Sequence, residues 1–361
     1  MPARCSWTLA FGSCNHQEMD APALLSAAAS KPDVFAWLGD NVYNDLDDSG
    51  MPCEPIDCRN TQGLLPKMKT KFISIAFNYL SKAFPAWAER IAFSVMYEHN
   101  RRSHPQDMEA LSSAYETLGK KPEFLALRAA VPEVLATWDD HDFCRNDAGG
   151  GADTDVIGHG CPWANESQAL FLKFWRGEGA LAARQGRKGV YEAYTFTAKG
   201  GHVARVIMLD TRSWRTAHRT PNATDSSDEV ASEDGEGGAC LAAAGPSGYC
   251  QQTGPGATLL GAEQWAWLEQ ELAVAADVRV IGSSISFGAQ WAQNGDETWS
   301  VFPAERQRMF DLIKSTRSTG VVFISGDLQC VCMHTAHQRL ACECASSSHG
   351  SPTRHATARL W

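Results

Sequence analysis

Residues 34–43 read VFAWLGDNVY, and this stretch decides which kind of fold the chain can adopt. Its first half, Val34–Leu38, is a run of apolar residues with the length of a buried strand. The second half turns polar at once, with an aspartate, an asparagine and a tyrosine directly behind the strand. Open α/β folds place their ligand sites beyond the carboxyl ends of the strands. The stretch therefore predicts a buried strand that delivers polar side chains to a site.

Similar short apolar or β-branched runs recur along the chain and alternate with helical patterns. We expect strands at 8–11, 34–38, 134–137, 191–197, 203–209, 279–283 and 321–325. We expect helices at 22–29, 108–118, 122–130, 166–175, 262–275 and 305–315. This alternation favours an α/β fold in which helices cover a largely β core.

Two stretches interrupt the alternation, and we interpret both as insertions into a single domain that spans 1–361. The first, at about 46–105, starts rich in cysteine, proline and glycine and continues with a helical, aromatic middle. It is either a helical subdomain that packs its own aromatic side chains or a lid over a site. The second, at about 219–256, is acidic and rich in glycine and serine, which is typical of a surface loop.

Composition and charge exclude several classes of protein. Hydrophobic residues make up 44% of the 361 residues and charged residues 20%, which is typical of a soluble globular protein. The formal net charge of −10 argues against a protein that binds nucleic acid or an anionic membrane. No stretch reaches the roughly 20 apolar residues of a membrane helix. The first residues lack the pattern of a secretory signal, and the compartment stays open.

The 12 cysteines allow two interpretations in different parts of the chain. Cys53 with Cys58, and Cys240 with Cys250, lie in segments where a loop disulfide could close. Four more near the C-terminus form two C-x-C pairs, at 330–332 and 342–344. These are either a zinc site with an unusual ligand spacing or strand cysteines that pack as small hydrophobic residues.

Polar clusters follow four of the expected strands. They read GSCNHQ (12–17), GDNVY (39–43), DDHD (139–142) and GDLQ (326–329). Each has a structural explanation, as a turn, a core cysteine or a hydrogen-bonded histidine. Together they indicate a metal centre, because carboxylates so close would repel one another without a cation. Oxygen ligands suit Fe³⁺, Ca²⁺ or Mg²⁺, and a cysteine thiolate selects a transition metal.

Six segments in this order resemble the PhoD-like alkaline phosphatases, a branch of the calcineurin-like metallophosphoesterases. They are GSCN (12–15), WLGDNVY (37–43), TWDDHD (137–142), LDTR (209–212), LGAEQWAWL (260–268) and SGD (325–327). The resemblance spans about 9–327, apart from the two insertions. It implies a four-layer α/β/β/α sandwich and a small-molecule phosphate ester as substrate. Members of this family are often secreted or periplasmic.

The resemblance also implies a centre of Fe³⁺ and Ca²⁺, with other divalent metals as alternatives. The residues that it assigns to the metals are Cys14, Asp40, Tyr43, Asp139, Asp140, Asp327 and Gln329. Among them Cys14 and Tyr43 would bind iron, Asp327 would complete the iron shell, and Asp40 would bridge the two metals. Asp140 would hold the second metal, with Asp139 nearby.

The implied reaction is phosphate ester hydrolysis by a metal-activated water or hydroxide, of either monoesters or diesters. His141 would face the phosphate and stabilise charge or protonate the leaving oxygen, and Asn15 and Arg212 would support it. Serine-hydrolase and P-loop chemistry lack support, because the chain contains neither a G-x-S-x-G nor a Walker motif.

One position departs from the family pattern and keeps a different function open. The family carries a histidine where this chain has Gln329, and a carboxamide offers an oxygen for calcium but no acid–base chemistry. His334 could replace it if the strand bulges. The alternative function is therefore a catalytically weakened protein of the same fold that binds a phosphate ligand or another protein. A third interpretation is an interaction protein that uses the aromatic insertion.

Overall fold

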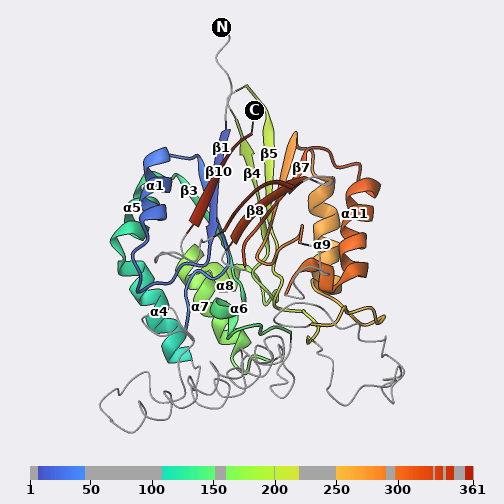
Figure 1. Cartoon of the computed structure of the whole chain (residues 1–361), viewed down its shortest axis with the longest axis horizontal. Coiled ribbons are helices and arrows are strands. Elements are labelled where there is room, and N and C mark those ends of the chain that lie inside the picture. The colour runs from blue at the N-terminus through green and yellow to red at the C-terminus, as the bar shows by residue number, and fades with distance from the viewer. Residues whose placement is uncertain are drawn as a thin grey trace, which may run out of the picture.

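Two β-sheets form the centre of the molecule (Figure 1), in a computed structural model. The model describes residues 7–44, 108–150, 160–198, 200–218, 249–289, 297–327, 330–335, 339–344 and 354–360. The first sheet has the order β10-β1-β2-β3 and the second the order β4-β5-β6-β7-β8-β9. The expected insertion at 46–105 and Gln329 lie outside the described residues.

The first sheet is parallel except at one edge. It contains β1 (Trp7–Ser13), β2 (Val34–Leu38) and β3 (Glu133–Thr137), with β10 (Arg354–Leu360) antiparallel beside β1. Because β1, β2 and β3 run in the same direction, the segments that follow them emerge at the same edge of the sheet.

The second sheet has a parallel middle flanked by antiparallel strands. Its parallel strands are β5 (Val203–Met208), β6 (Val278–Ser283) and β7 (Val321–Ser325). Its outer strands are β4 (Glu192–Thr197), β8 (Cys330–Thr335) and β9 (Arg339–Cys344).

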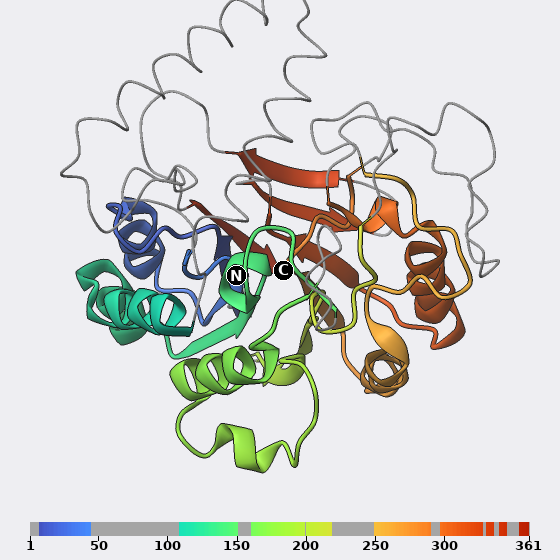
Figure 2. The same cartoon turned by 90° about the horizontal axis from the view of Figure 1, so that it is seen from below.

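The helices divide between the two sheets, as the view from below shows (Figure 2). On the side of the first sheet lie α1 (Pro22–Ser30), α4 (Met108–Lys120), α5 (Pro122–Ala130), α7 (Ala164–Arg176) and the short α8 (Ala180–Ala183). On the side of the second lie α9 (Gly261–Ala273) and α11 (Pro303–Ser315), with the 3-10 turn η1 (Trp299–Val301). The short α6 (Asp140–Phe143) follows β3 directly. Helices α1, α5 and α11 each start at a proline, whose fixed φ suits the first helical turn.

Three hydrophobic clusters hold these elements together. One joins the two sheets, since it combines Leu9 and Phe11 of β1 with Val206 of β5 and Val280 of β6. A second lies between the first sheet and its helices, and a third between the second sheet and α9 and α11. Burial of apolar surface in these clusters fixes the sheets relative to each other. None of the helices in the described part of the chain is long and apolar enough to cross a membrane.

The mixed α/β class, the seven expected strands and the six expected helices are all confirmed, with ends displaced by a residue or two. The sequence analysis missed β8, β9, β10, α6, α8 and η1. Cys330 pairs with Cys344 and Cys332 with Cys342 in the β8–β9 ladder, so these cysteines do lie in strands. Cys250 is disulfide-bonded, while Cys53, Cys58 and Cys240 lie outside the described residues.

Candidate metal centre

The loops after β1 and β2 are joined by backbone hydrogen bonds. The N–H of Cys14 donates to the carbonyl of Gly39 at 3.3 Å, and that of Asn15 donates to the carbonyl of Asp40 at 2.8 Å. Backbone φ angles are positive at Cys14 (57°), Asp40 (49°) and Asp327 (64°). Residues with side chains seldom adopt this left-handed region, which costs about 1–3 kcal/mol each and is found most often at functional sites. Three of the described non-glycine residues with positive φ are thus among those expected to bind a metal, and Asp147, at 55°, is another that lies near them.

Two glycines allow the strand ends to approach one another closely. A Cβ at Gly39, where φ is 96°, would lie 2.5 Å from Cβ of Asp139 and 2.9 Å from Cβ of Ser284. A Cβ at Gly326 would lie 2.7 Å from Cβ of Ser13. Any larger residue would push the polar loops of the two sheets apart, so these glycines close the site.

Cys14, Asp40 and Tyr43 form one side of the site, and all three are buried. The Tyr43 hydroxyl donates a hydrogen bond of 3.0 Å to Oδ2 of Asp40, and the Cys14 thiol lies 3.6 Å from the same oxygen. Burial, and then the charge of Asp40, raise the pKa of Cys14 and of Tyr43 well above their usual values. Burial and the charge of Asp140 do the same to the pKa of Asp40. Burial and neighbouring negative charge therefore favour the protonated form of each of these three groups.

The first residues of α6 form the facing side. One ligand atom each from Asp40, Asp140 and His141 lies within 4.8 Å of the other two. The rings of Tyr43 and His141 are 4.4 Å apart. Burial raises the pKa of Asp140, but the charges of His141 and Arg212 outweigh it and leave the pKa below its ordinary value. Asp140 is therefore the carboxylate of this group that is ionised most readily.

Arg212 is fully buried and links three carboxylates. Its Nε donates to Oδ1 of Asp139, its Nη1 lies 2.7 Å from Oε2 of Glu297, and its Nη2 lies 3.8 Å from Oδ1 of Asp140. The Ser284 hydroxyl donates a further hydrogen bond of 2.8 Å to Oδ1 of Asp139. These contacts fix Asp139 through Oδ1, and its buried Oδ2 has no hydrogen-bond partner among the described residues.

Glu297 is a central residue that the sequence analysis missed. Its Oε1 lies 2.9 Å from Nε of Arg215 and 2.7 Å from Nε2 of His218. Burial opposes ionisation, but the charges of Arg212, Arg215 and His218 hold its pKa well below the usual range. No strand-end pattern marks Glu297, because it follows β6 only after a long connection.

Asp147 is a second missed residue, and it extends the site toward Glu297. Ligand atoms of Asp140, Asp147 and Glu297 lie within 4.8 Å of one another. The Tyr249 hydroxyl donates to Oδ2 of Asp147, and the Tyr249 ring stacks on His218 at 4.1 Å. Tyr249 is buried, so the expected surface loop at 219–256 is wrong at its C-terminal end, where these contacts draw the chain inward.

Asp142 and Asn15 form hydrogen bonds with the loops around the site. The side-chain amide of Asn41 and the N–H of Asp139 donate to the two oxygens of Asp142. The side-chain amide of Asn15 donates to the carbonyl of Asn41 at 3.2 Å. Both residues therefore hold the loop that carries Asp40.

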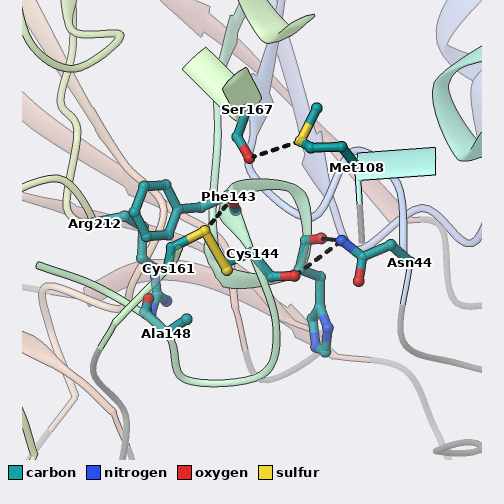
Figure 3. Close-up of a disulfide and its surroundings, with 9 residues drawn as sticks. Asn44, Met108, Phe143, Cys144, Ala148, Cys161, Ser167 and Arg212 are labelled. Carbon is teal, nitrogen blue, oxygen red and sulfur yellow. Dashed lines mark hydrogen bonds between the residues drawn. A yellow bond between two sulfur atoms is a disulfide. The ribbon is translucent and has the colours of Figure 1, made fainter. Parts of the chain in front are cut away.

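A disulfide between Cys144 and Cys161 braces the end of α6 (Figure 3). The Asn44 amide donates to the carbonyls of Cys144 at 2.9 Å and of His141 at 3.1 Å. Sγ of Cys161 lies 3.6 Å from the carbonyl of Phe143. The sequence analysis missed this bridge, which ties the helix of Asp140 and His141 to a segment 17 residues further along.

The donors present fit a cation. Carboxyl groups outnumber guanidinium groups here; the acids are Asp40, Asp139, Asp140, Asp147, Glu297 and Asp327, against Arg212 and Arg215. Oδ1 of Asp40 and Oδ2 of Asp139 are buried without a hydrogen-bond partner among the described residues. An unpaired buried carboxylate oxygen is costly unless a cation takes its charge. A thiol and a phenol beside carboxylates form a mixed soft and hard donor set, which suits a transition metal.

Asp327 lies close enough to this group for its pKa to respond. Its burial and the charges of Asp139, Glu297, Asp140 and Asp40 raise its pKa well above the usual value. His334 lies on β8 opposite Phe323 of β7.

Comparisons with known proteins identify the family of the chain. The family model of the PhoD-like phosphatases matches residues 89–355, more than half of the chain. Alkaline phosphatase D of Bacillus subtilis (strain 168) is 27% identical over 217 residues, which cover 56% of this chain and 32% of that protein. The chain thus spans about a third of the length of this curated relative.

Solved structures with a similar fold were also found. A structure of PhoD superposes with a TM-score of 0.53 and 22% identity, and covers 90% of this chain and 51% of that chain. A dimetal phosphatase from Danio rerio gives a TM-score of 0.38 and 11% identity, with 97% of this chain and 98% of that chain covered. The first likeness supports the fold, and the second is too weak to support an inference.

Proposed function

The chain belongs to the PhoD-like phosphatase family, and from this premise we propose that it hydrolyses phosphate esters at a metal centre. The observation that carries the proposal is the convergence of Cys14, Asp40, Tyr43 and Asp140 in a buried site with more acids than bases. A phosphatase would use such a site to hold cations opposite a phosphate.

Cys14, Asp40 and Tyr43 would hold one metal, and Asp40 would share its carboxylate with a second metal at Asp140. Asp327, Gln329 and Asp139 complete the proposed set. Oδ1 of Asp139 accepts a hydrogen bond from Arg212, so only Oδ2 would be available as a metal ligand. We keep Fe³⁺ and Ca²⁺ as the proposed pair, because a thiolate and a phenolate suit the former and carboxylates the latter.

Bound cations would neutralise the phosphate oxygens and lower the pKa of an attacking water. His141 would stand at the phosphate and give a proton to the leaving oxygen. Tyr43, whose ring contacts that of His141, would limit its rotation. Arg212 is fully buried, so its supporting role is to orient Asp139, Asp140 and Glu297 rather than to reach the substrate.

The fold that accompanies this function is the four-layer α/β/β/α sandwich. It is supported by the order of the hydrophobic clusters, from helices to first sheet, second sheet and helices.

The test is elemental analysis of the purified chain together with hydrolysis of an aryl phosphate, with and without a chelator. We expect bound metal and chelator-sensitive turnover. Asp40→Ala and Cys14→Ser should lose metal and reduce turnover by about 10²–10³-fold or more. The matched control is Glu305→Gln, since Glu305 is also buried but serves Trp265 and the backbone of Leu259 and Leu260.

Unchanged turnover in Asp40→Ala and Cys14→Ser would contradict the proposal. Bound metal without turnover in the wild-type chain would instead favour the binding module, in which Gln329 replaces a catalytic histidine. Monoester and diester substrates compared side by side would give the specificity.

A further inference from the structure

A pocket of about 510 Å³ opens between α7, α8 and the first residue of β4. None of its lining residues belongs to the candidate metal centre. Small-molecule pockets typically measure about 300–1,000 Å³, so there is room for more than a bare ion. The charged residues that line it are Arg176, Arg184, Arg187 and Glu192, and we call this site the arginine pocket.

Three guanidinium groups in the arginine pocket share one carboxylate oxygen. Oε2 of Glu192 lies 2.6 Å from Nη1 of Arg176, 2.7 Å from Nη1 of Arg184 and 3.5 Å from Nη2 of Arg187. Three positive charges therefore meet one negative charge. The lining carries a surplus of two positive charges, which matches the charge of a phosphate group.

Glu192 is the only acid among the described residues that lines the pocket, and Asp210 acts on Arg184 from outside that lining. Burial, and then the charges of Arg187 and Arg176, lower the pKa of Arg184 to about 10. Asp210, whose Oδ2 accepts 2.8 Å hydrogen bonds from the N–H of Val190 and the hydroxyl of Ser213, offsets only part of this effect. The guanidinium groups thus repel one another, and a bound anion would relieve the repulsion.

Arg187 is the arginine best placed to contact a ligand. Its side chain is 30% exposed, against 16% for Arg176 and 6% for Arg184. The Arg187 guanidinium lies 4.4 Å from the centre of the Tyr191 ring, which holds its plane in one orientation. A guanidinium held in this way presents the planar donor fork that binds phosphate oxygens in pairs.

A purely structural role explains part of this arrangement. Nη2 of Arg184 donates to the carbonyls of Gly189 at 2.7 Å and Tyr191 at 3.2 Å, so the cluster does tie the chain between α8 and β4. Nη2 of Arg176 donates to the carbonyl of Val190 at 2.9 Å and Nη2 of Arg187 to that of Tyr191 at 2.7 Å, so all three arginines hold this segment. That role does not explain the surplus charge or the open volume.

We propose that the arginine pocket binds the phosphate group of a small molecule, at a second site separate from the metal centre. Inorganic phosphate and an organic phosphate share the chemistry that the pocket recognises. This proposal does not depend on hydrolysis, because it rests on none of the residues of the metal centre.

The test is isothermal titration of the full chain with inorganic phosphate and, separately, with phenylphosphonate, which a phosphatase does not hydrolyse. We compare the wild-type chain with Arg187→Gln, which removes one donor fork. The matched control is Lys173→Gln, because Lys173 is a cation on α7 that pairs with Glu178 in solvent and does not line the pocket. Circular dichroism checks that each variant is folded.

We expect Arg187→Gln to bind one ligand fewer per chain, or to weaken that site at least about tenfold, as the loss of a charged hydrogen bond predicts. Lys173→Gln should match the wild type. Arg187→Lys, which keeps the charge, provides a second folded variant and should weaken binding less than Arg187→Gln.

The number of sites separates this proposal from the proposed function. If the metal centre does not bind phosphate, the wild-type chain still binds one ligand and Arg187→Gln none. Tighter binding of phenylphosphonate than of phosphate would identify an organic phosphate as the ligand, and the reverse order would identify the free ion. Equal site number and affinity in the wild type and Arg187→Gln, or no binding by either probe, would overturn the proposal.

Discussion

Two clusters in this molecule are both built from arginines that share one glutamate, but one has an excess of acids and the other an excess of arginines. In the first, Arg212 and Arg215 share Glu297 and are surrounded by further acids. In the second, three arginines share Glu192, and no further acid among the described residues lines the pocket. A surplus of charge attracts an ion of the opposite sign, most strongly where the charges are buried and more weakly at a partly exposed pocket. The sign of the excess charge, rather than the ion pairs themselves, therefore predicts a cation at the acidic cluster and an anion at the arginine pocket.

We expect the largest effect from removing the carboxylate that the acidic cluster shares. Glu297→Gln leaves Arg212, Arg215 and His218 without their shared carboxylate in a fully buried position. Removing one partner of a buried pair costs about 3–5 kcal/mol. We expect a loss of that size in the free energy of unfolding, measured by denaturant titration. Glu178→Gln, in an exposed pair with Lys173, is the control, and an equal loss in both variants would contradict the expectation.

Removal of the Cys144–Cys161 disulfide tests whether only the acidic cluster depends on this brace. Closing a loop of about 15 residues stabilises a protein by roughly 3 kcal/mol, and this bridge spans 17 residues. We expect the double variant Cys144→Ser with Cys161→Ser to lose about that much stability and part of its metal. Phosphate binding at the arginine pocket should be unchanged. Equal loss of both ligands would show that the two sites are not independent.

Glu192→Gln tests whether the surplus positive charge of the arginine pocket is what binds phosphate. Glu192 is 33% exposed, and pairs of that kind contribute at most about 1 kcal/mol to stability. We expect a change below that size in the free energy of unfolding, together with tighter phosphate binding, because the competing carboxylate is gone. Weaker phosphate binding, measured by the same titration, would indicate that Glu192 orients the arginines and that the surplus charge is not what binds.

Salt should produce the smallest and most selective effect. Raising the ionic strength from about 0.01 M to about 1 M shortens the Debye length from about 30 Å to about 3 Å. We expect phosphate binding at the partly exposed arginine pocket to weaken, whereas the metal content of the buried centre should stay the same. The measurement is the phosphate titration repeated at each salt concentration, with elemental analysis after dialysis. Metal loss in salt would mean that solvent reaches the acidic cluster.

Sequence patterns could predict the strand-end residues, because parallel strands bring the segments behind them to one edge. Asp40 and Asp140 are adjacent in space for that reason. Glu297 could not be predicted in this way, since it reaches the site through a long connection after β6. Asp147 was missed because its place depends on contacts with Tyr249 and Asp140. The contact with Tyr249 joins parts of the chain that are 102 residues apart.

The strands, like the site residues, divide into those predicted by the local sequence and those placed by contacts with distant residues. Strands with apolar runs, such as β2, could be predicted from the pattern alone. Strand β10 reads RHATARL, and its apolar positions alternate with polar ones but are mostly alanine, which has little preference for strands; its pairing with β1 places it at the sheet edge. The arginine pocket was missed for a related reason. Three basic residues between 176 and 187 look like an ordinary solvated surface until the fold brings them to one pocket, where Glu192 is the only acidic lining residue in the described part of the chain.

The Cys144–Cys161 bridge has a consequence for how the protein matures. Such a bond forms and persists in an oxidising environment, yet Cys14 is not disulfide-bonded. Exchange between thiols and disulfides requires access to the sulfur, and Cys14 is only 2% exposed. Where an oxidant forms the bridge, folding of the β1 loop would protect the Cys14 thiol from the same reagent, because the enclosed sulfur is out of its reach. A closed bridge and an intact thiol can then coexist in one chain.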